Sequence, residues 1–227
     1  MSLQMVNPNA NSISVDALEI NVRAAISLKE LLKTNLGPKG KLKMLVSGAG
    51  DLTLTKDGAV LLKQMQIEHP TACVIARNAA AQDQISGDGS TSLVLFIGEL
   101  LQKSAQLVAD GVHPRNISDG IELGRKDALR FLEHFAKDVS EDLVKDREFI
   151  CAVASSSLRT KLPRAEADHL TGIVVDSVMS IRREGRETDL FMVEVVTMEH
   201  KSVLDSVLVD GLVLDHGFRH PRFYIKD

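Results

Sequence analysis

The sequence has few aromatic residues and few cysteines, and each shortage restricts what the protein can be. It has no Trp and one Tyr, and aromatics make up 4% of its 227 residues. A core in such a chain has to be built from Ala, Val, Leu and Ile, which favours close-packed helices. Cys73 and Cys151 lie among small apolar residues without the spacing of a metal site. We expect buried, reduced thiols, with a single disulfide as the alternative.

The chain also lacks an excess of positive charge and a long apolar run. Its net charge is −4, whereas a nucleic-acid-binding protein usually carries a basic excess. The longest apolar run, Leu93 to Ile97, is far shorter than the roughly 20 residues of a membrane span. The first residues, MSLQMVNPNANS, lack the charged and apolar segments of a secretory signal. We therefore expect a cytoplasmic protein that binds neither nucleic acid nor a membrane.

What the chain does contain is mostly helical in pattern. Apolar spacing predicts a helix over 14–35 that ends at NLGPKG, and KMLVSGAGDLTLT predicts a β-hairpin over 43–55. Further helices are expected after Asp57-Gly58, from Pro70 to Gly87, and over 92–110, the last one apolar on most sides and hence deeply buried. Between residues 140 and 165 the helical block gives way to an α/β segment. There FMVEVVTME and SVLDSVLVDGLVLDHG, rich in β-branched residues, predict strands.

The segment QISGDGSTSLVLFIGELL places a glycine turn and three hydroxyls directly before an apolar helix. Glycines allow close backbone approach to a ligand, and the N–H groups at a helix start attract phosphate. Asp88 adds a carboxylate of the kind that Mg²⁺ prefers. A Ser or Thr helix cap is the simpler interpretation, although a cap needs only one hydroxyl. The segment is not a Walker A loop, because no Gly-Lys-Ser/Thr follows, which argues against a P-loop NTPase.

Two other turns allow a structural and a functional interpretation. TNLGPKGK exposes backbone N–H groups near Lys39, but a helix end at Gly37 with a proline beyond also explains it. In LTKDGAVLL, Asp57 either caps the following helix or directs its carboxylate at a nucleotide.

These motifs occur together and in order with HPTACVIARNAAAQDQISGDGSTS, GVHPRNISDG, SSSLRTKL and GLVLDHGFRHP. In this combination the chain, from about residue 7 to Pro221, resembles the amino-terminal part of a group II chaperonin subunit, of the eukaryotic cytosolic TRiC/CCT type. The resemblance implies an ATP-dependent chaperone, which folds actin, tubulin and other clients by ATP-driven closure of two stacked rings of eight subunits. It implies other chaperonin subunits and unfolded proteins as partners, and ATP with Mg²⁺ as cofactors.

The resemblance also implies roles for individual residues. Asp88 would bind Mg²⁺, and Asp57 would lie near the γ-phosphate and help to position water or a counter-ion as the catalytic residue. The nucleotide would contact the residues of three segments: Thr34, Asn35, Gly37 and Pro38; Gly89, Ser90, Thr91 and Ser92; Thr160 and Lys161. Ser90 stands where the family usually has Thr, and the hydroxyl is retained.

By the same resemblance the fold class is a mostly α equatorial ATPase domain, over residues 1–145, followed by a small α/β intermediate-domain segment over 146–211. Residues 212–227 would only begin the apical domain, which is essentially missing. The expected pocket is then incomplete, since the family's water-activating aspartate lies in the missing part. We therefore expect weak Mg-ATP binding without productive hydrolysis. The alternative is a non-catalytic fragment that binds nucleotide weakly or only mediates subunit interactions.

Overall fold

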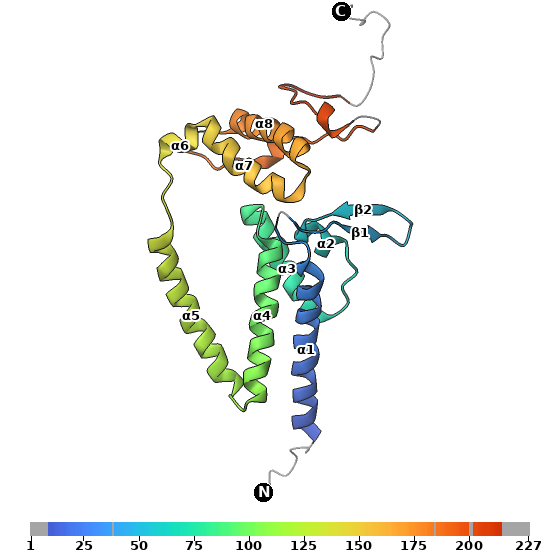
Figure 1. Cartoon of the computed structure of the whole chain (residues 1–227), viewed down its shortest axis with the longest axis vertical. Coiled ribbons are helices and arrows are strands. Elements are labelled where there is room, and N and C mark those ends of the chain that lie inside the picture. The colour runs from blue at the N-terminus through green and yellow to red at the C-terminus, as the bar shows by residue number, and fades with distance from the viewer. Residues whose placement is uncertain (1–8, 38, 184, 200–201, 215–227) are drawn as a thin grey trace, which may run out of the picture. The chain divides into compact units, whose positions relative to one another are not determined.

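The computed structural model describes residues 9–37, 39–183, 185–199 and 202–214, and it forms two compact units divided between Ser140 and Glu141. Figure 1 shows the elements of each unit. The first unit consists of a helix, a hairpin and four further helices: α1 (Asn9–Lys33), β1 (Lys43–Val46), β2 (Leu52–Thr55), α2 (Gly58–Gln64), α3 (Pro70–Ser86), α4 (Ser90–Ala109) and α5 (Pro114–Phe135).

Local signals in the sequence account for most of these boundaries. The predicted hairpin is confirmed, with β1 and β2 antiparallel and Lys43 paired with Thr55. Pro70 is the first residue of α3, and Gly87 ends that helix in the left-handed conformation at φ 67°, which glycine adopts without steric cost. The helices expected over 14–35 and after Asp57 are confirmed as α1 and α2.

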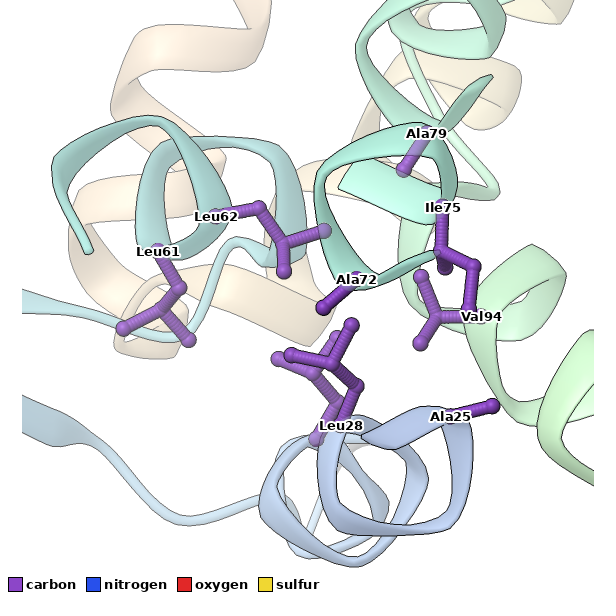
Figure 2. Close-up of a cluster of buried hydrophobic side chains, with 9 residues drawn as sticks. Ala25, Leu28, Leu61, Leu62, Ala72, Ile75, Ala79 and Val94 are labelled. Carbon is purple, nitrogen blue, oxygen red and sulfur yellow. The ribbon is translucent and has the colours of Figure 1, made fainter. Parts of the chain in front are cut away.

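The core of the first unit is aliphatic, as the shortage of aromatics predicts. Its buried side chains come from α1, α2, α3 and α4 and are drawn in Figure 2: Ala25, Leu28, Leu32, Leu61, Leu62, Ala72, Ile75, Ala79 and Val94. Short side chains let the helix axes approach closely. Cys73 lies beside this core and donates a hydrogen bond to the Ile67 carbonyl at 3.0 Å. Both cysteines are half-buried free thiols in the structure.

Helix α4 is less buried than its apolar composition predicts. Its buried residues are Ser90, Val94 and Gly98, and Phe96 is 62% exposed. The expectation of a deeply buried helix is therefore wrong: the buried residues are spaced four apart and so lie on one face, and the main neighbours of α4 among the described residues are α1 and α3. By length and composition alone, α4 is also the one described helix apolar enough to cross a membrane.

The second unit contains α6 (Glu141–Lys145), α7 (Arg147–Lys161), α8 (Arg164–Ile181) and two 3-10 turns, η1 (Leu190–Met192) and η2 (Val203–Asp205). Helices α7 and α8 pack together, and Arg147 of α7 donates two hydrogen bonds, of 2.7 and 2.8 Å, to the Asp176 carboxylate of α8. The Nε2 atom of His169, on α8, lies 2.9 Å from the carbonyl oxygen of Ser206, the residue after η2.

The strands predicted in the Val-rich segments of this unit are not observed in its described residues. Residues 191–199 and 202–214 form the two 3-10 turns and irregular chain. Val-rich composition reports only a preference for extended chain. A strand also needs a hydrogen-bonded neighbour, and the described part of this unit provides none.

Candidate nucleotide site

The turn between β2 and α2 is fixed by Asp57. Its Oδ1 accepts a hydrogen bond from the Val60 N–H at 2.9 Å and caps α2, while its own N–H donates to Thr55 Oγ1 at 3.0 Å. The capping interpretation of Asp57 is therefore confirmed. A helix-capping carboxylate can also face a ligand, so the cap does not exclude such a role.

Gly58, the next residue, brings this turn against the start of α4. Gly58 is buried, and a methyl group at its Cα would lie 3.1 Å from the Thr91 nitrogen and 3.2 Å from Ser90 Oγ, and closer still to Thr91 Oγ1. No other residue type has a backbone that can approach so closely without displacing the neighbour. The turn at Asp57 and the hydroxyls at the start of α4 therefore meet, although about 30 residues separate them in the sequence.

The glycine turn before α4 has a geometry that a helix cap does not require. Gly87 and Gly89 both adopt positive φ, at 67° and 84°, and Gly89 is the N-cap residue, with no side chain to cap the helix. The three hydroxyls, of Ser90, Thr91 and Ser92, lie within the first turn of α4 and not at its cap position. The cap interpretation is therefore wrong for these hydroxyls. The first N–H groups of a helix have no acceptor within it and attract anions.

Asp88 lies between the two glycines, on the exposed surface of the turn. Its Oδ1 accepts a hydrogen bond from the Gly89 N–H at 2.8 Å, and its carbonyl accepts one from Ser86 Oγ at 2.8 Å. The side chain is therefore oriented by its own turn. In the described part of the chain no three His, Cys, Asp or Glu residues gather as a metal cage. The single carboxylate of Asp88 beside a helix start is a donor set that fits Mg²⁺ in a phosphate site, where the ion uses one or two carboxylates with phosphate and water oxygens.

The third predicted segment begins where α1 ends. Asn35 is buried, and its Nδ2 donates to the carbonyl of Lys56, the residue before Asp57, at 3.4 Å. Thr34 accepts a hydrogen bond from the Lys43 ammonium at 2.8 Å on Oγ1. Gly37 adopts φ 82°, as a turn at a helix end requires. Pro38 lies outside the described residues.

The structure thus brings three of the predicted segments together around Asp57 and Gly58, in the first unit. We call Thr34–Gly37, Asp57–Gly58 and Gly87–Ser92 the turn cluster. Thr160 and Lys161 belong to the second unit, at the end of α7, where Thr160 Oγ1 donates to the Ser157 carbonyl at 2.7 Å.

Sequence reasoning missed Gly58 as a site residue. A weak signal was present, because Gly58 is the first residue of α2 and glycine is a poorer helix former than alanine. A glycine at this position is explained if a side chain there would collide with a neighbour. That neighbour, the start of α4, is visible only in the folded chain.

The chain is similar to known proteins over most of its length. Residues 28–226 match the model of the TCP-1/cpn60 chaperonin family. The chain is 51% identical over 222 residues to T-complex protein 1 subunit zeta-2 of Mus musculus, an alignment that covers 97% of this chain and 41% of that protein. It is 53% identical over 205 residues to the Homo sapiens subunit of the same name, covering 90% of this chain and 38% of that protein.

The chain therefore spans about two fifths of the length of the curated relatives it matches. Both relatives are zeta-type subunits, so the chain is similar to this type of subunit.

Proposed function

Because the chain belongs to the TCP-1/cpn60 chaperonin family, we propose that its turn cluster binds ATP with Mg²⁺ and that it acts in an ATP-dependent molecular chaperone. The proposed partners are other chaperonin subunits, in a double ring of eight per ring, and unfolded proteins such as actin and tubulin. The proposed location is the cytoplasm. Residues 1–145 are proposed as equatorial, 146–211 as intermediate and 212–227 as the start of the apical domain.

One observation carries the nucleotide proposal: the close packing of Gly58 on Ser90 and Thr91. It places a carboxylate-bearing turn beside a helix start that has positive-φ glycines and three hydroxyls. The Asn35–Lys56 hydrogen bond adds the end of α1 to the same place. A helix cap does not require these contacts between separate turns. A polyphosphate site with a bound cation, in contrast, needs N–H donors, hydroxyls and a carboxylate within a few ångströms of each other.

The roles of the residues follow from their chemistry. The first N–H groups of α4 and the hydroxyls of Ser90, Thr91 and Ser92 would donate hydrogen bonds to phosphate oxygens. Asp88 would hold Mg²⁺, which when bound neutralises charge on the phosphates in phosphoryl transfer. Asp57, held by its cap to Val60, would orient a water molecule near the terminal phosphate. Thr34, Asn35, Gly37 and Pro38 would approach the nucleotide from the end of α1, and Thr160 and Lys161 from α7.

We expect Asp88→Asn to weaken ATP binding in the presence of Mg²⁺ by at least roughly tenfold. The amide oxygen can still accept the Gly89 hydrogen bond, so the turn is retained while the charge that holds the cation is lost. The measurement is equilibrium dialysis of radiolabelled ATP against the whole chain, with Mg²⁺ and with a chelator. In the chelator, the variant and the wild type should bind alike.

Asp119→Asn is the matched control, because Asp119 pairs with Arg115 on the exposed surface of α5 and the same charge is removed. This control should bind ATP as the wild type does. No ATP binding by the wild type, or equal Mg²⁺-dependent binding by Asp88→Asn, would contradict the proposed site.

A further inference from the structure

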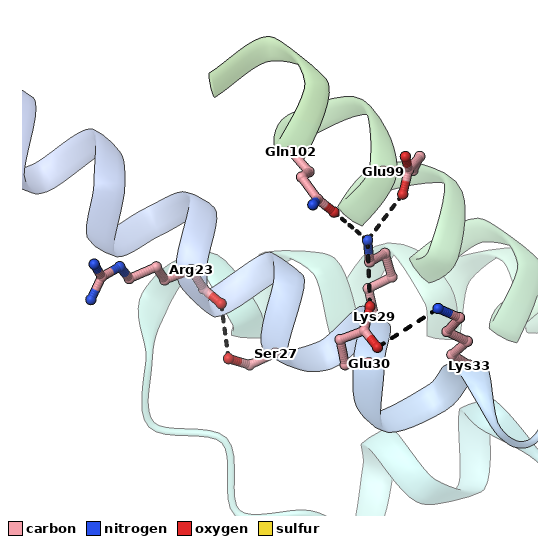
Figure 3. A network of polar contacts seen from close by, with 7 residues as sticks. All are labelled: Arg23, Ser27, Lys29, Glu30, Lys33, Glu99 and Gln102. Atoms are coloured by element: carbon pink, nitrogen blue, oxygen red, sulfur yellow. Dashed lines mark hydrogen bonds and ion pairs between the residues drawn. The ribbon is translucent and has the colours of Figure 1, made fainter. Parts of the chain in front are cut away.

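A charged side chain lies within the contact between α1 and α4. These helices run antiparallel (Figure 1), and their buried core side chains are the aliphatic ones of Ala25, Leu28, Leu32 and Val94. Lys29 of α1 is only 8% exposed. Its ammonium lies 3.0 Å from Glu99 Oε2 on α4, donates to the Gln102 side-chain oxygen, and lies 3.5 Å from Glu30 Oε1, as Figure 3 shows. The ammonium therefore has two partners on the facing helix and one on its own.

Gly98 makes room for this side chain. A methyl group at Gly98 would lie 2.6 Å from Lys29 Cβ and 3.1 Å from its Cγ and Cδ. The stem of Lys29 therefore lies directly on the α4 backbone, and its charged end reaches the next residue, Glu99. Lys29 is held at one point along α4, by backbone contact and by charge together.

Such a contact determines the alignment of the two helices along their axes. The aliphatic contacts of Ala25, Leu28 and Val94 are non-directional and would tolerate sliding. A slide of one turn, about 5.4 Å, would separate Lys29 from Glu99 and Gln102 and leave its charge in the helix contact without those partners. Lys29, rather than the half-exposed Glu99, would bear this cost, because a charge left in a helix contact without its partners is strongly unfavourable.

Helix α1 ends at the turn cluster and helix α4 begins there, so their alignment affects the cluster. Lys29 lies five residues before Thr34 and Glu99 nine residues after Ser90, or about 7 Å and 14 Å along helices that rise 1.5 Å per residue. Helix α1 leads to Asn35 on the Lys56 carbonyl, and α4 begins with the hydroxyls on Gly58. A shift between the helices therefore changes the separation of the two turns.

We infer that Lys29 and Glu99 are positioning residues for the turn cluster, which hold its α1 side and its α4 side at a fixed separation before a phosphate-bearing ligand binds. The part of the inference that concerns a ligand rests on the proposed function, whereas the part that concerns helix alignment does not. It predicts that the pair matters more to the turns than to the stability of the fold.

The test compares Lys29→Met, Glu99→Gln and the double variant with the wild type, as whole chains. Methionine keeps an apolar stem of similar length on Gly98, and removing both charges together leaves no charge without its partner in the helix contact, a change that is often neutral for stability. We expect the double variant to melt near the wild-type temperature. We also expect its Mg-ATP affinity to fall roughly tenfold to a hundredfold, because displaced binding groups lose this much.

Hydrogen exchange of residues 86–96 without nucleotide is the second measurement, and we expect it to be at least about tenfold faster in the double variant. Arg147→Met is the matched control, since it breaks an ion pair with two hydrogen bonds in the second unit. It should leave both the ATP affinity and this exchange unchanged.

The two measurements separate the possible failures. If the wild type binds no ATP, the proposed function fails and hydrogen exchange alone decides the positioning role. Unchanged exchange at residues 86–96 in the double variant overturns the inference in every case. In the remaining case, the wild type binds ATP, and the double variant exchanges faster but binds ATP with unchanged affinity. This result overturns the inference that the pair positions the ligand site.

Discussion

At the scale of single residues, the most demanding position in the turn cluster is Gly58. Its backbone touches Ser90 and Thr91, and at the same time it is the first residue of α2, directly after the Asp57 cap. Glycine is also a poorer helix former than alanine. Here the close approach of two turns outweighs helix propensity.

We therefore expect Gly58→Ala to destabilise the protein by about 1–3 kcal/mol, because the added methyl group forces α2 and α4 apart. Thermal unfolding of the whole chain, followed by circular dichroism, measures this. Gly120→Ala is the control: it lies within α5 with no atom near a new methyl group, so it should raise stability by up to about 1 kcal/mol. Equal stabilisation by both substitutions would refute the close packing at Gly58.

At the scale of elements, ion pairs hold the helices of each unit together. In the first unit, Lys29 joins α1 to α4. The hydrogen bond to Glu99 and the charge of Glu99 raise the pKa of the Lys29 ammonium. In the second unit, Arg147 joins α7 to α8, and its hydrogen bonds lower the pKa of the Asp176 carboxyl below the ordinary value. Both pairs link helices that are separate in the sequence, unlike the pairs within α5.

The Asp176 pair predicts that the second unit loses stability in acid. A lowered pKa in the folded state means that the stabilisation is fully present above the ordinary aspartate pKa and is lost as the pH falls through the folded value. Wild-type melting temperature should therefore drop more on acidification than that of Asp176→Asn, which has no carboxyl to protonate. Melting curves at a series of pH values measure this, and parallel curves for the two proteins would contradict it.

At the scale of the whole molecule, the chain contains two units with separate buried residues. The first is built around Leu32, Leu61 and Val94, and the second around Ala167, Thr171 and Val175. Helix α5, at the end of the first unit, has no buried residue among its 22 described positions, and its Phe131 and Phe135 rings stack while exposed. A domain with its own core can in principle unfold independently of its neighbour.

We therefore expect two unfolding transitions by calorimetry, each sensitive to its own core. Leu61→Ala should cost the first unit about 2–5 kcal/mol and leave the other transition in place. Val175→Ala removes less apolar volume and should cost the second unit roughly 1–3 kcal/mol. If both substitutions lower one common transition, the two units unfold as one.

Much of the fold could be predicted because its signals are local. Pro70 and Gly87 bound α3, Asp57 caps α2, and the alternation in KMLVSGAGDLTLT forms the hairpin. Each of these depends on backbone angles and hydrogen bonds within a few residues. The predicted Val-rich strands and the deep burial of α4 depended instead on distant partners, and both predictions were wrong.

For the candidate site, the sequence by itself determined the chemistry: glycines that allow positive φ, three hydroxyls, and the carboxylates of Asp57 and Asp88. Only the tertiary structure decided that these groups lie together, through Gly58 on Ser90 and Thr91 and through Asn35 on the Lys56 carbonyl. The alignment set by Lys29 on Gly98 and Glu99 was also decided there. The physical reason is that residue types fix what a group can bind, whereas contacts across 21 to 70 residues of chain depend on how the helices pack.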